Sequence, residues 1–582
     1  MDSKNLSNNQ IVTVKTTSQV IEESTLDFIA QNPSALYNET FCSAGVTEAV
    51  KLAVDLENTV REKAFKIRVS QDITILSVAI CISEREDVAL IGAGDKSQSG
   101  RKQILTAEQM LKLPIVFYQS DGANKGVWEI ANNPLTTFGI LVGRYKPNAT
   151  EKEKKEIFTL TKSRLQVAGK IVPKCVNPHY VAVNNGVWDS SSRKLLSFDP
   201  KMVFTSKIHT NLNLAATNPV ITVPEDGSTW DVDSWLNSLG SPEFVESIKE
   251  VFQAACYNLV PWNKMVLFYS TYGCNAKGTI CQTIRNIVGH NSAISIPLNK
   301  FSKQFELGDL PNATCIIVDE NDVNDYITGL STLKAIITSD VVRVEQKFQA
   351  SYDYVFDGLV LQCVNALPRV VDKTGSFERR LHIIPFTQCF TGVERKYIKD
   401  RLIYRDDVLE YLLKMVLVDM PYRTAFTENS ETQAALRDYV ITNNSVVAFL
   451  DEILPKCKWD LLPATDFLYE IYKQWYRKVS PAGKTMGRND FIQGLKEYVF
   501  THTRQNPNFE WEWTDSCRWQ GYIPLNQYEP LVDEYNIEPL KSVIYWTIHN
   551  SAYVHTNQLP VHYSGLKRRK AASPSQGTNT DN

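Results

Sequence analysis

The sequence predicts an α/β protein built around a phosphate-binding loop, and three consecutive stretches carry this prediction. Met265–Tyr269 is an apolar run that suits a buried strand. It leads into the small-residue loop Ser270-Thr-Tyr-Gly-Cys-Asn-Ala-Lys-Gly-Thr279, after which isoleucine and valine recur at helical spacing from Ile280 to Val288. Strand, loop with Lys and hydroxyl, then helix is the order that a P-loop requires.

The loop departs from the general P-loop pattern at three positions. The pattern has Gly six residues before the Lys and directly before it, where this chain has Thr271 and Ala276. It also has a hydroxyl directly after the Lys, where this chain has Gly278 and places Thr279 one step later. An ordinary strand–turn–helix with a solvated Lys277 is therefore an alternative for this segment alone. The Cβ of Ala276 could restrict a tight backbone, so we expect slow ATP hydrolysis.

A second apolar strand, Ala313–Val318, ends in the acidic pair Asp319-Glu320. One carboxylate at such a strand end can hold Mg²⁺, and the other can orient the attacking water. Acidic residues also cap strand ends without any catalytic role, and this reading stays open for the pair taken by itself.

A third apolar strand, Gly358–Val364, delivers Asn365 at its end, and Arg379 and Arg380 precede the run Leu381–Phe386. A polar side chain at a strand tip can sense the γ-phosphate. An Arg from a neighbouring subunit can stabilise charge in the transition state. Four such features in this order favour a nucleotide site over four unrelated coincidences.

Beyond these motifs, the chain resembles the helicase part of the phage, plasmid and large-DNA-virus primase-helicases, within superfamily three of the AAA+ ATPases. The resemblance covers residues 175–390 well and 440–500 weakly. Further segments that follow the family pattern are Tyr180–Asp189, Leu195–Pro200, Asn211–Ala216, Leu333–Asp340, Val344–Phe348 and Tyr354–Phe356.

The resemblance implies roles for individual residues. Lys277 matches the P-loop Lys, Asn365 the sensor Asn, and Arg380 the arginine finger, with Arg379 as its neighbour and substitute. Lys347 lies where the family places its DNA-contacting hairpin, although a solvated strand Lys is equally common. The implied ATP-binding residues are Gly273, Asn275, Ala276, Lys277, Gly278 and Thr279; the implied catalytic acids are Asp319 and Glu320; the implied Mg²⁺ ligands are Thr279 and Asp319.

The implied activity is ATP-dependent DNA unwinding by a homo-oligomeric ring, generally a hexamer, that translocates on single-stranded or forked DNA during replication. The first 175 residues contain no Asp-x-Asp pair and are short for a primase, so we expect a helicase without a primase domain and a separate primase among its partners. The main alternative is an ATP-binding replication initiator that melts an origin without processive unwinding. A small-molecule kinase is a weaker one.

Composition is that of an ordinary globular chain, with 43% hydrophobic and 22% charged residues among 582. The formal net charge of −3 excludes an overall basic field, so DNA contacts must come from local patches or from a channel formed by oligomerisation. We find no signal-peptide core and no apolar run of the ~18 residues that a membrane span needs. These features predict a protein of a bacterial host cytoplasm. The 11 cysteines read as free thiols, and Cys175 with His179 lacks a second pair for zinc.

The predicted C-terminal domain resembles a winged helix, with amphipathic helices at Phe467–Arg477 and Arg488–Tyr498. Its phosphate-contact candidates are Lys484, Arg488 and Lys496, its core candidates are Phe467, Trp475 and Phe491, and Trp511, Trp513 and Trp519 either stack on bases or lie buried in a small sheet. The predicted divisions are a disordered start (1–10), an N-terminal mixed α/β module (11–145), a pre-ATPase region (146–245), the AAA+ core (246–390), a helical lid (391–445), the winged-helix-like domain (446–565) and a disordered basic and polar tail (566–582) that contains Lys567–Lys570.

Overall fold

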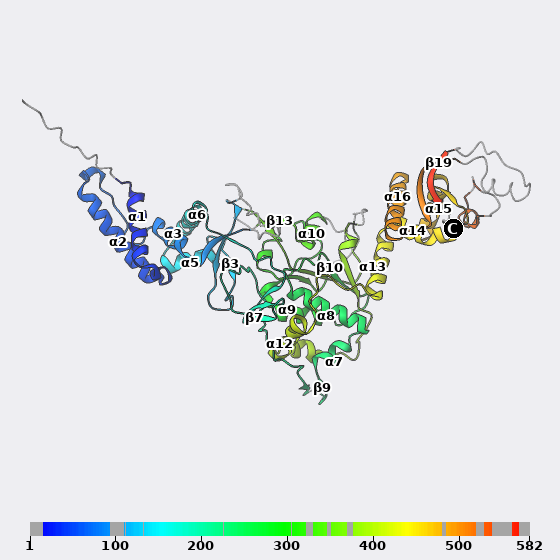
Figure 1. Cartoon of the computed structure of the whole chain (residues 1–582), viewed down its shortest axis with the longest axis horizontal. Helices are drawn as coiled ribbons and strands as arrows, with labels where there is room; N and C mark the ends of the chain where they lie inside the picture. The colour runs from blue at the N-terminus through cyan, green and yellow to red at the C-terminus, as the bar shows by residue number, and fades with distance from the viewer. Residues whose placement is uncertain are drawn as a thin grey trace, which may run out of the picture. The chain divides into compact units, whose positions relative to one another are not determined.

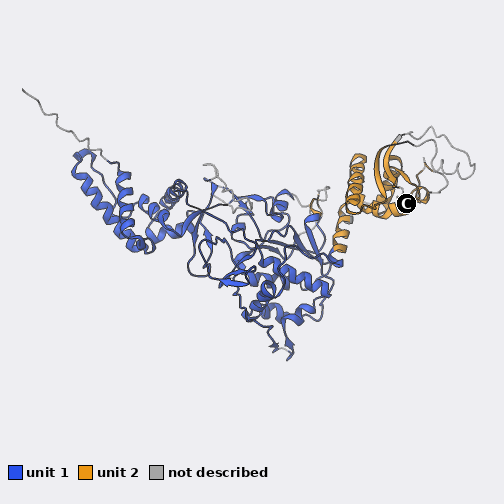
Figure 2. Ribbon diagram, viewed as in Figure 1, with its two compact units in different colours: residues 1–368, 379–432 blue, residues 369–378, 433–582 orange. Residues whose placement is uncertain are grey.

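The computed structural model describes residues 15–92, 110, 112–131, 133–224, 226–303, 305–321, 330–345, 351–368, 370, 376–479, 485–518, 529–537, 540 and 562–569. The chain divides into two compact units, one of residues 1–368 with 379–432 and the other of residues 369–378 with 433–582 (Figure 2). Within the described ranges, no helix combines the length and apolar character needed to cross a bilayer.

The N-terminal module of the first unit extends past the predicted boundary at residue 145, because β4 belongs to its sheet. It packs helices against a four-stranded mixed sheet of order β3-β2-β1-β4, in which β1 runs parallel to β4 and antiparallel to β2 (Figure 1). The apolar run near residue 75 forms α3, whose Val78 and Ile82 are fully buried. The elements are α1 (Thr17–Gln31), α2 (Glu39–Thr59), α3 (Ile75–Glu84), β1 (Val88–Gly92), β2 (Ile115–Tyr118), β3 (Trp128–Ile130), α5 (Thr137–Tyr145), α6 (Glu151–Val167) and β4 (Ile171–Pro173).

The charged segment 146–156 contains the start of helix α6. Thr150 caps α6, because its Oγ1 accepts a hydrogen bond from the backbone N–H of Glu153 at 3.3 Å. The Glu153 carboxylate accepts one in return from the Thr150 backbone N–H at 2.8 Å. This reciprocal capping box satisfies two backbone donors at once.

A region of small antiparallel ladders and two helices connects the module to the central sheet. Its strands are β5 (Tyr180–Val183), β6 (Gly186–Asp189) and β7 (Lys194–Leu196) in one sheet, and β8 (Ile221–Thr222) with β9 (Thr229–Trp230) in another. Helix α7 (Val232–Asn237) and helix α8 (Pro242–Cys256) follow, and α8 buries Phe244, Val251 and Phe252 in the main core.

The central sheet is five-stranded and entirely parallel, with the order β11-β12-β15-β10-β16. Its strands are β11 (Ala293–Ile294), β12 (Cys315–Val318), β15 (Leu359–Val364), β10 (Met265–Tyr269) and β16 (Leu381–Pro385). Nearly every strand residue is buried, as expected for a parallel sheet covered on both faces. The predicted α/β class is confirmed, and the strands predicted near residues 265, 313 and 358 are present.

Helices and one hairpin accompany this sheet. Helix α9 (Lys277–Val288) follows β10 through the predicted loop. Helix α10 (Leu330–Ile337) precedes the antiparallel hairpin of β13 (Val341–Val344) and β14 (Tyr352–Val355). After β16 the chain is helical, as predicted for the lid, with α11 (Lys396–Asp400), α12 (Asp406–Lys414) and a π-helical turn at Met415–Asp419.

The second unit has its own core around a three-stranded antiparallel sheet of order β17-β19-β18. Phe467, Trp475 and Phe491 are buried in that core as predicted. After α13 (Ser430–Asn443), at which the two units meet in sequence, the elements are α14 (Ser445–Ile453), β17 (Leu461–Pro463), α15 (Tyr469–Val479), α16 (Arg488–Gln505), β18 (Trp511–Arg518), α17 (Pro530–Glu534) and β19 (His562–Arg568).

The prediction that a disordered tail begins at residue 566 is wrong at its start. Leu566 is fully buried in β19, and β19 continues through Lys567 to Arg568. The Arg568 guanidinium lies 4.6 Å from the ring centre of Trp511 and pairs with Asp460 at 3.0 Å. Packing on a tryptophan and pairing with a carboxylate therefore order residues that composition alone assigns to a tail. Residues 1–14 and 570–582, including Lys570, lie outside the described residues.

Candidate functional site

The predicted site segments leave the central sheet at its carboxyl edge. The register pairs the last residues of β10 and β15, Tyr269 and Val364, and β12 runs parallel beside β15. The loop after β10, Asn365 after β15 and the acidic pair after β12 therefore emerge on the same side of the sheet. In open α/β sheets this edge is where ligands bind.

The loop between β10 and α9 has an unusual backbone at two residues. Cys274 has a φ of 52° and Ala276 a φ of 67°, both in the left-handed region that favours glycine. The conformation expected of a glycine at position 276 is thus retained although the residue is Ala. Asn275 is buried and braces the loop: its side-chain amide donates to the Tyr272 carbonyl, and its Oδ1 accepts from the Lys277 backbone N–H at 3.3 Å.

Lys277 is the first residue of α9 and is 7% exposed. Its Nζ donates to Asn365 Oδ1 at 2.9 Å, to the Val364 carbonyl at 3.3 Å and to the Ser270 carbonyl at 3.4 Å. Burial lowers the pKa of Lys277. The structure therefore brings the predicted P-loop Lys and the predicted sensor Asn into direct contact. Three neutral oxygens surround the ammonium group, and no carboxylate of the described residues lies at hydrogen-bonding distance from it.

The acidic pair lies beside α9, and Asp319 already has a cationic partner. Arg285 Nη1 lies 2.8 Å and 2.9 Å from the two oxygens of Asp319, and Arg285 Nη2 donates to the Ile317 carbonyl at 2.9 Å. The Asp319 side chain is 47% exposed, so this pair contributes at most about 1 kcal/mol and can open. Glu320 is exposed. Sequence reasoning did not find Arg285.

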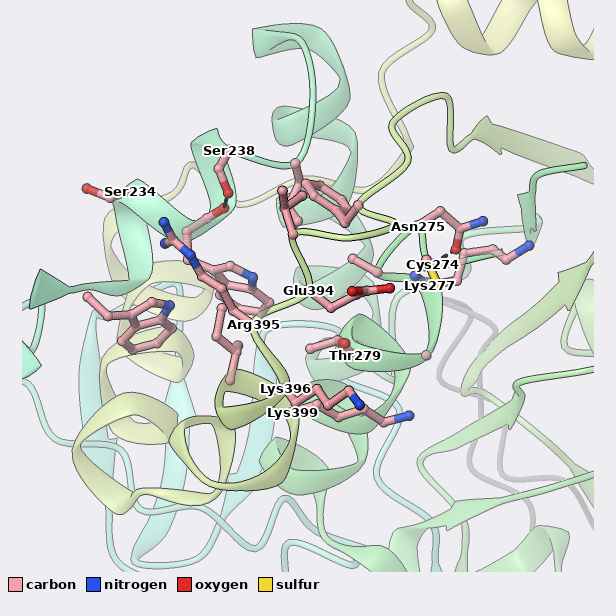
Figure 3. Close-up of a pocket in the computed structure, with 18 of the residues that line it drawn as sticks. Ser234, Ser238, Cys274, Asn275, Lys277, Thr279, Glu394, Arg395, Lys396 and Lys399 are labelled. Carbon is pink, nitrogen blue, oxygen red and sulfur yellow. Dashed lines mark hydrogen bonds between the residues drawn. The ribbon is translucent and has the colours of Figure 1, made fainter. Parts of the chain in front are cut away.

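A cavity of about 590 Å³ lies next to the loop, between α7 and the segment around α11 (Figure 3). Thr279 and Gly278 line it, together with Lys396 and Lys399. Sequence reasoning missed most of its walls, which combine aromatic, aliphatic, hydroxyl, cationic and acidic side chains. They are Thr229, Trp230, Asp231, Ser234, Trp235, Ser238, Leu239, Phe390, Val393, Glu394, Arg395, Lys396, Ile398 and Lys399.

The chemistry of this region fits a nucleoside triphosphate. Phosphates fit one part of the cavity, where the left-handed loop residues, the N–H groups of the first turn of α9 and the lysines lie. A base fits the part lined by the tryptophans and aliphatic side chains. For Mg²⁺, the described residues hold no group of three or more His, Cys, Asp or Glu side chains. Thr279 and Asp319 are oxygen donors of the kind that this ion prefers alongside phosphate oxygens.

Arg379 and Arg380 lie at the opposite edge of the sheet. They end a short 3₁₀ helix directly before β16, and the register pairs Leu381, the first residue of β16, with Met265, the first residue of β10. The five-residue strand β10 separates that edge from the loop by about 16 Å. Arg379 is exposed and Arg380 half-buried. Neither arginine is placed to serve the loop of its own chain.

Three segments of the chain match known protein families. Residues 142–253 match "D5 N terminal like", residues 268–380 match a family of unknown function (DUF5906), and residues 441–531 match "Poxvirus D5 protein-like". The two D5 matches, which lie on either side of the DUF5906 match, support a phage or viral primase-helicase family for this chain. All the motif residues from Lys277 to Arg380 fall within the second match, and residues before 142 fall outside these three matches.

Two solved structures, both of the C-terminal region of NrS-1, are similar to this chain. The A form apo structure of that region shares 11% identity over 62% of this chain and 88% of that chain, with a TM-score of 0.33. The apo structure titled 305-718 shares 14% identity over 51% of this chain and 69% of that chain, with a TM-score of 0.31. No curated protein matches the chain.

The predicted DNA-contacting Lys347 lies outside the described residues, but its flanks form the antiparallel hairpin of β13 and β14. The hairpin is anchored at its base by a partly buried cation, Lys174. Lys174 Nζ lies 2.9 Å from Asp357 Oδ2 and donates to the Val355 carbonyl at 3.1 Å. Because Lys174 directly follows β4, this contact ties the N-terminal module to the segment that carries the predicted DNA contact.

In the second unit, the predicted phosphate contacts are only partly described. Arg488 and Lys496 are exposed on α16, and Lys496 lies 4.7 Å from the ring centre of Trp513 and 3.7 Å from Asp515. Lys484 and Trp519 lie outside the described residues. Trp511 is 3% exposed, as burial in a small sheet predicts.

Proposed function

We propose that this protein is an ATP-dependent DNA helicase that acts as a homo-oligomeric ring, with ATP shared between neighbouring copies. The observation that carries the proposal is the separation of its two cationic groups. Lys277 touches Asn365 at the carboxyl edge of the sheet, while Arg379 and Arg380 lie at the amino edge. A site that needs both kinds of group is completed by a second chain.

The strand order supports membership of the AAA+ superfamily-three ATPases. Strand β15, which Asn365 follows, lies between the P-loop strand β10 and the acidic strand β12. In the second unit, the elements run helix α14, strand β17, helices α15 and α16, and strands β18 and β19 with the short helix α17 between them. This succession, with β19 in the middle of the sheet, supports a winged-helix domain. Such a domain would bind DNA phosphates through Arg488 and Lys496.

In the proposed reaction, each residue has a separate task. The loop from Gly273 to Thr279 surrounds the phosphates, and Lys277 turns from its neutral oxygens to the β- and γ-phosphate oxygens. Thr279 and Asp319 would hold Mg²⁺, which would supply neutralisation of phosphate charge. Glu320 orients the attacking water, Asn365 reports the γ-phosphate, and Arg380 of the neighbouring copy stabilises charge that develops on transfer.

Mixing two inactive variants tests the shared site. Lys277→Ala and Arg380→Ala proteins, each nearly inactive alone, should regain ATP hydrolysis when mixed, because some interfaces then combine an intact loop with an intact arginine. Hydrolysis should rise with single-stranded DNA. Wild-type protein that hydrolyses no ATP, or Lys277→Ala protein that hydrolyses it at the wild-type rate, contradicts the proposal.

The second candidate function is a replication initiator that melts the DNA duplex locally. For both candidates we propose a bacterial cytoplasm as the location and a separate primase as a partner. The pairing of Asp319 with Arg285 and the missing hydroxyl at Gly278 favour slow turnover, which suits a protein that marks or opens an origin. Strand displacement on a forked substrate distinguishes the two functions. A helicase displaces a long strand in an ATP-dependent manner, whereas an initiator binds or melts the fork and stops.

A further inference from the structure

The residue directly after the P-loop Lys has no side chain, and a cation lies in the adjoining space. A Cβ built on Gly278 would lie 3.5 Å from Lys399 Nζ, an ordinary contact distance. In the general P-loop pattern this position carries the hydroxyl that binds Mg²⁺. The Lys399 ammonium therefore lies beside the place that such a hydroxyl would occupy.

Lys399 is held there by the packing of α11. Ile398, its neighbour, is 8% exposed and belongs to the main core, together with residues of α9. Asn286 of α9 also donates to the carbonyl of Ile403 at 2.8 Å, which fastens the segment after α11 to the same helix. Lys399 is thus positioned over the first turn of α9 by contacts that do not involve its own charge.

The Lys399 ammonium is available for an anion. Its side chain is exposed, lines the 590 Å³ cavity and forms no ion pair with any carboxylate of the described residues. Lys396 and Arg395 line the same cavity, as does the carboxylate of Glu394, and Figure 3 shows Lys396 and Lys399 beside Thr279. The lysines next to the N-terminus of α9 add to the partial positive charge of that helix end.

The acidic group expected to help hold the metal is, by contrast, already neutralised. Both oxygens of Asp319 lie within 2.9 Å of Arg285 Nη1. The ordinary means of holding Mg²⁺ in a P-loop are therefore weakened at two points, at Gly278 and at Asp319, while an extra cation stands beside the first of them.

We propose that Lys399 is a phosphate-binding residue that replaces part of the charge neutralisation otherwise supplied by Mg²⁺, so that nucleotide binding depends only weakly on the ion. The inference rests on the proposed nucleotide site and adds a residue to it. Hydrolysis still uses Mg²⁺, because Lys399 provides no route for activating water. Since Lys399 is exposed, its contribution decreases as ionic strength rises.

Binding of a fluorescent ATP analogue to the full-length protein, with Mg²⁺ or with EDTA, tests the role of Lys399. For wild type we expect Kd to rise by less than about tenfold on chelation. Lys399→Gln should raise Kd about tenfold in EDTA and by a smaller factor with Mg²⁺. Lys194→Gln, an exposed Lys that does not line the cavity, makes the same charge change and should leave both values unaltered.

A second variant examines the same space from the other side. Gly278→Ser restores a hydroxyl, and its Cβ fits without a clash against Lys399. It should tighten binding with Mg²⁺ and widen the difference between Mg²⁺ and EDTA.

The outcomes separate the two proposals. If wild type binds no nucleotide with Mg²⁺, both the proposed function and this inference are wrong. If wild type binds with Mg²⁺ but Lys399→Gln has the wild-type Kd in EDTA, or if wild-type binding disappears in EDTA, only the role of Lys399 is wrong.

Discussion

The two edges of the central sheet differ in how firmly they hold their charged groups. At the carboxyl edge, Lys277 is buried and fixed by Asn365 and two backbone carbonyls. At the amino edge, Arg379 is exposed and Arg380 half-buried. A group that serves its own chain can be pre-positioned by the core, whereas a group that serves a neighbour, as proposed for Arg380, must remain close to the surface. Variants at the two edges should therefore have different kinetic signatures.

Arg380→Ala should have the largest effect on hydrolysis. A cation supplied in trans stabilises the transition state more than the bound nucleotide, so kcat should fall about 10³-fold or more while nucleotide affinity changes little. Arg379→Ala is the matched control one residue away. If Arg379→Ala lowers kcat more than Arg380→Ala does, the trans role belongs to Arg379. Equal weakening of nucleotide binding by Arg380→Ala would show that its role lies in its own chain.

Lys277→Ala should weaken both steps. Its ammonium contacts the bound nucleotide in the ground state and in the transition state. We therefore expect nucleotide affinity to fall about 100-fold and the rate of ATP hydrolysis to fall by a larger factor. A direct binding titration beside a turnover assay checks this. Should Lys277→Ala retain wild-type affinity while losing turnover, the two edges would not differ in the way proposed.

Near the amino edge, His382 on β16 provides a pH-dependent test of the core. Burial, helped by nearby Lys264, lowers the pKa of His382 from 6.5 to about 4, and its ring stacks on Phe426 at 4.6 Å. Between pH 6.5 and 4 the unfolded chain binds a proton that the folded chain does not. The contribution of His382 to stability is therefore complete above pH 6.5 and decreases as pH falls toward 4.

Through His382, the free energy of unfolding decreases by about 2 kcal/mol between pH 7.5 and pH 5. Urea unfolding of wild type and His382→Phe at both pH values measures it. Phe preserves the stacking on Phe426 and cannot be protonated, so this variant should lose about 2 kcal/mol less than wild type on acidification. An identical loss in both proteins would mean that His382 is not buried in its neutral form.

Much of the fold and the loop could be predicted from the sequence because the relevant signals are local. The strands beneath Lys277 and Asn365 are unbroken apolar runs, and polar side chains follow directly at their ends. The pairing of Arg285 with Asp319 was not predictable in this way, because it joins a helix to a strand 34 residues further along the chain. The walls of the cavity come from segments around residues 230–239 and 390–399, which no local spacing connects.

Other features lay beyond sequence reasoning for a related reason. Composition placed Leu566 in a polar tail. In the structure, the burial of Leu566 and the stacking of Arg568 on Trp511 stabilise β19 as far as Arg568. The left-handed backbone at Ala276 was foreseeable, because the P-loop pattern has Gly there. In the structure, the backbone of Ala276 keeps this left-handed conformation, with a φ of 67°.

Ala276→Gly should have the smallest effect, and its sign is informative. Ala in the left-handed region costs about 1 kcal/mol, and Gly removes this cost while increasing the entropy of the unfolded chain. We expect a stability gain of about 0.5 kcal/mol, measured by urea unfolding, and faster hydrolysis if the strained loop limits turnover. Ala335→Gly, the same change within α10, should instead lose about 1 kcal/mol. A loss of similar size at both positions would show that the loop at the carboxyl edge is unstrained, and that its rigidity relative to the amino edge comes from Lys277 and Asn275 alone.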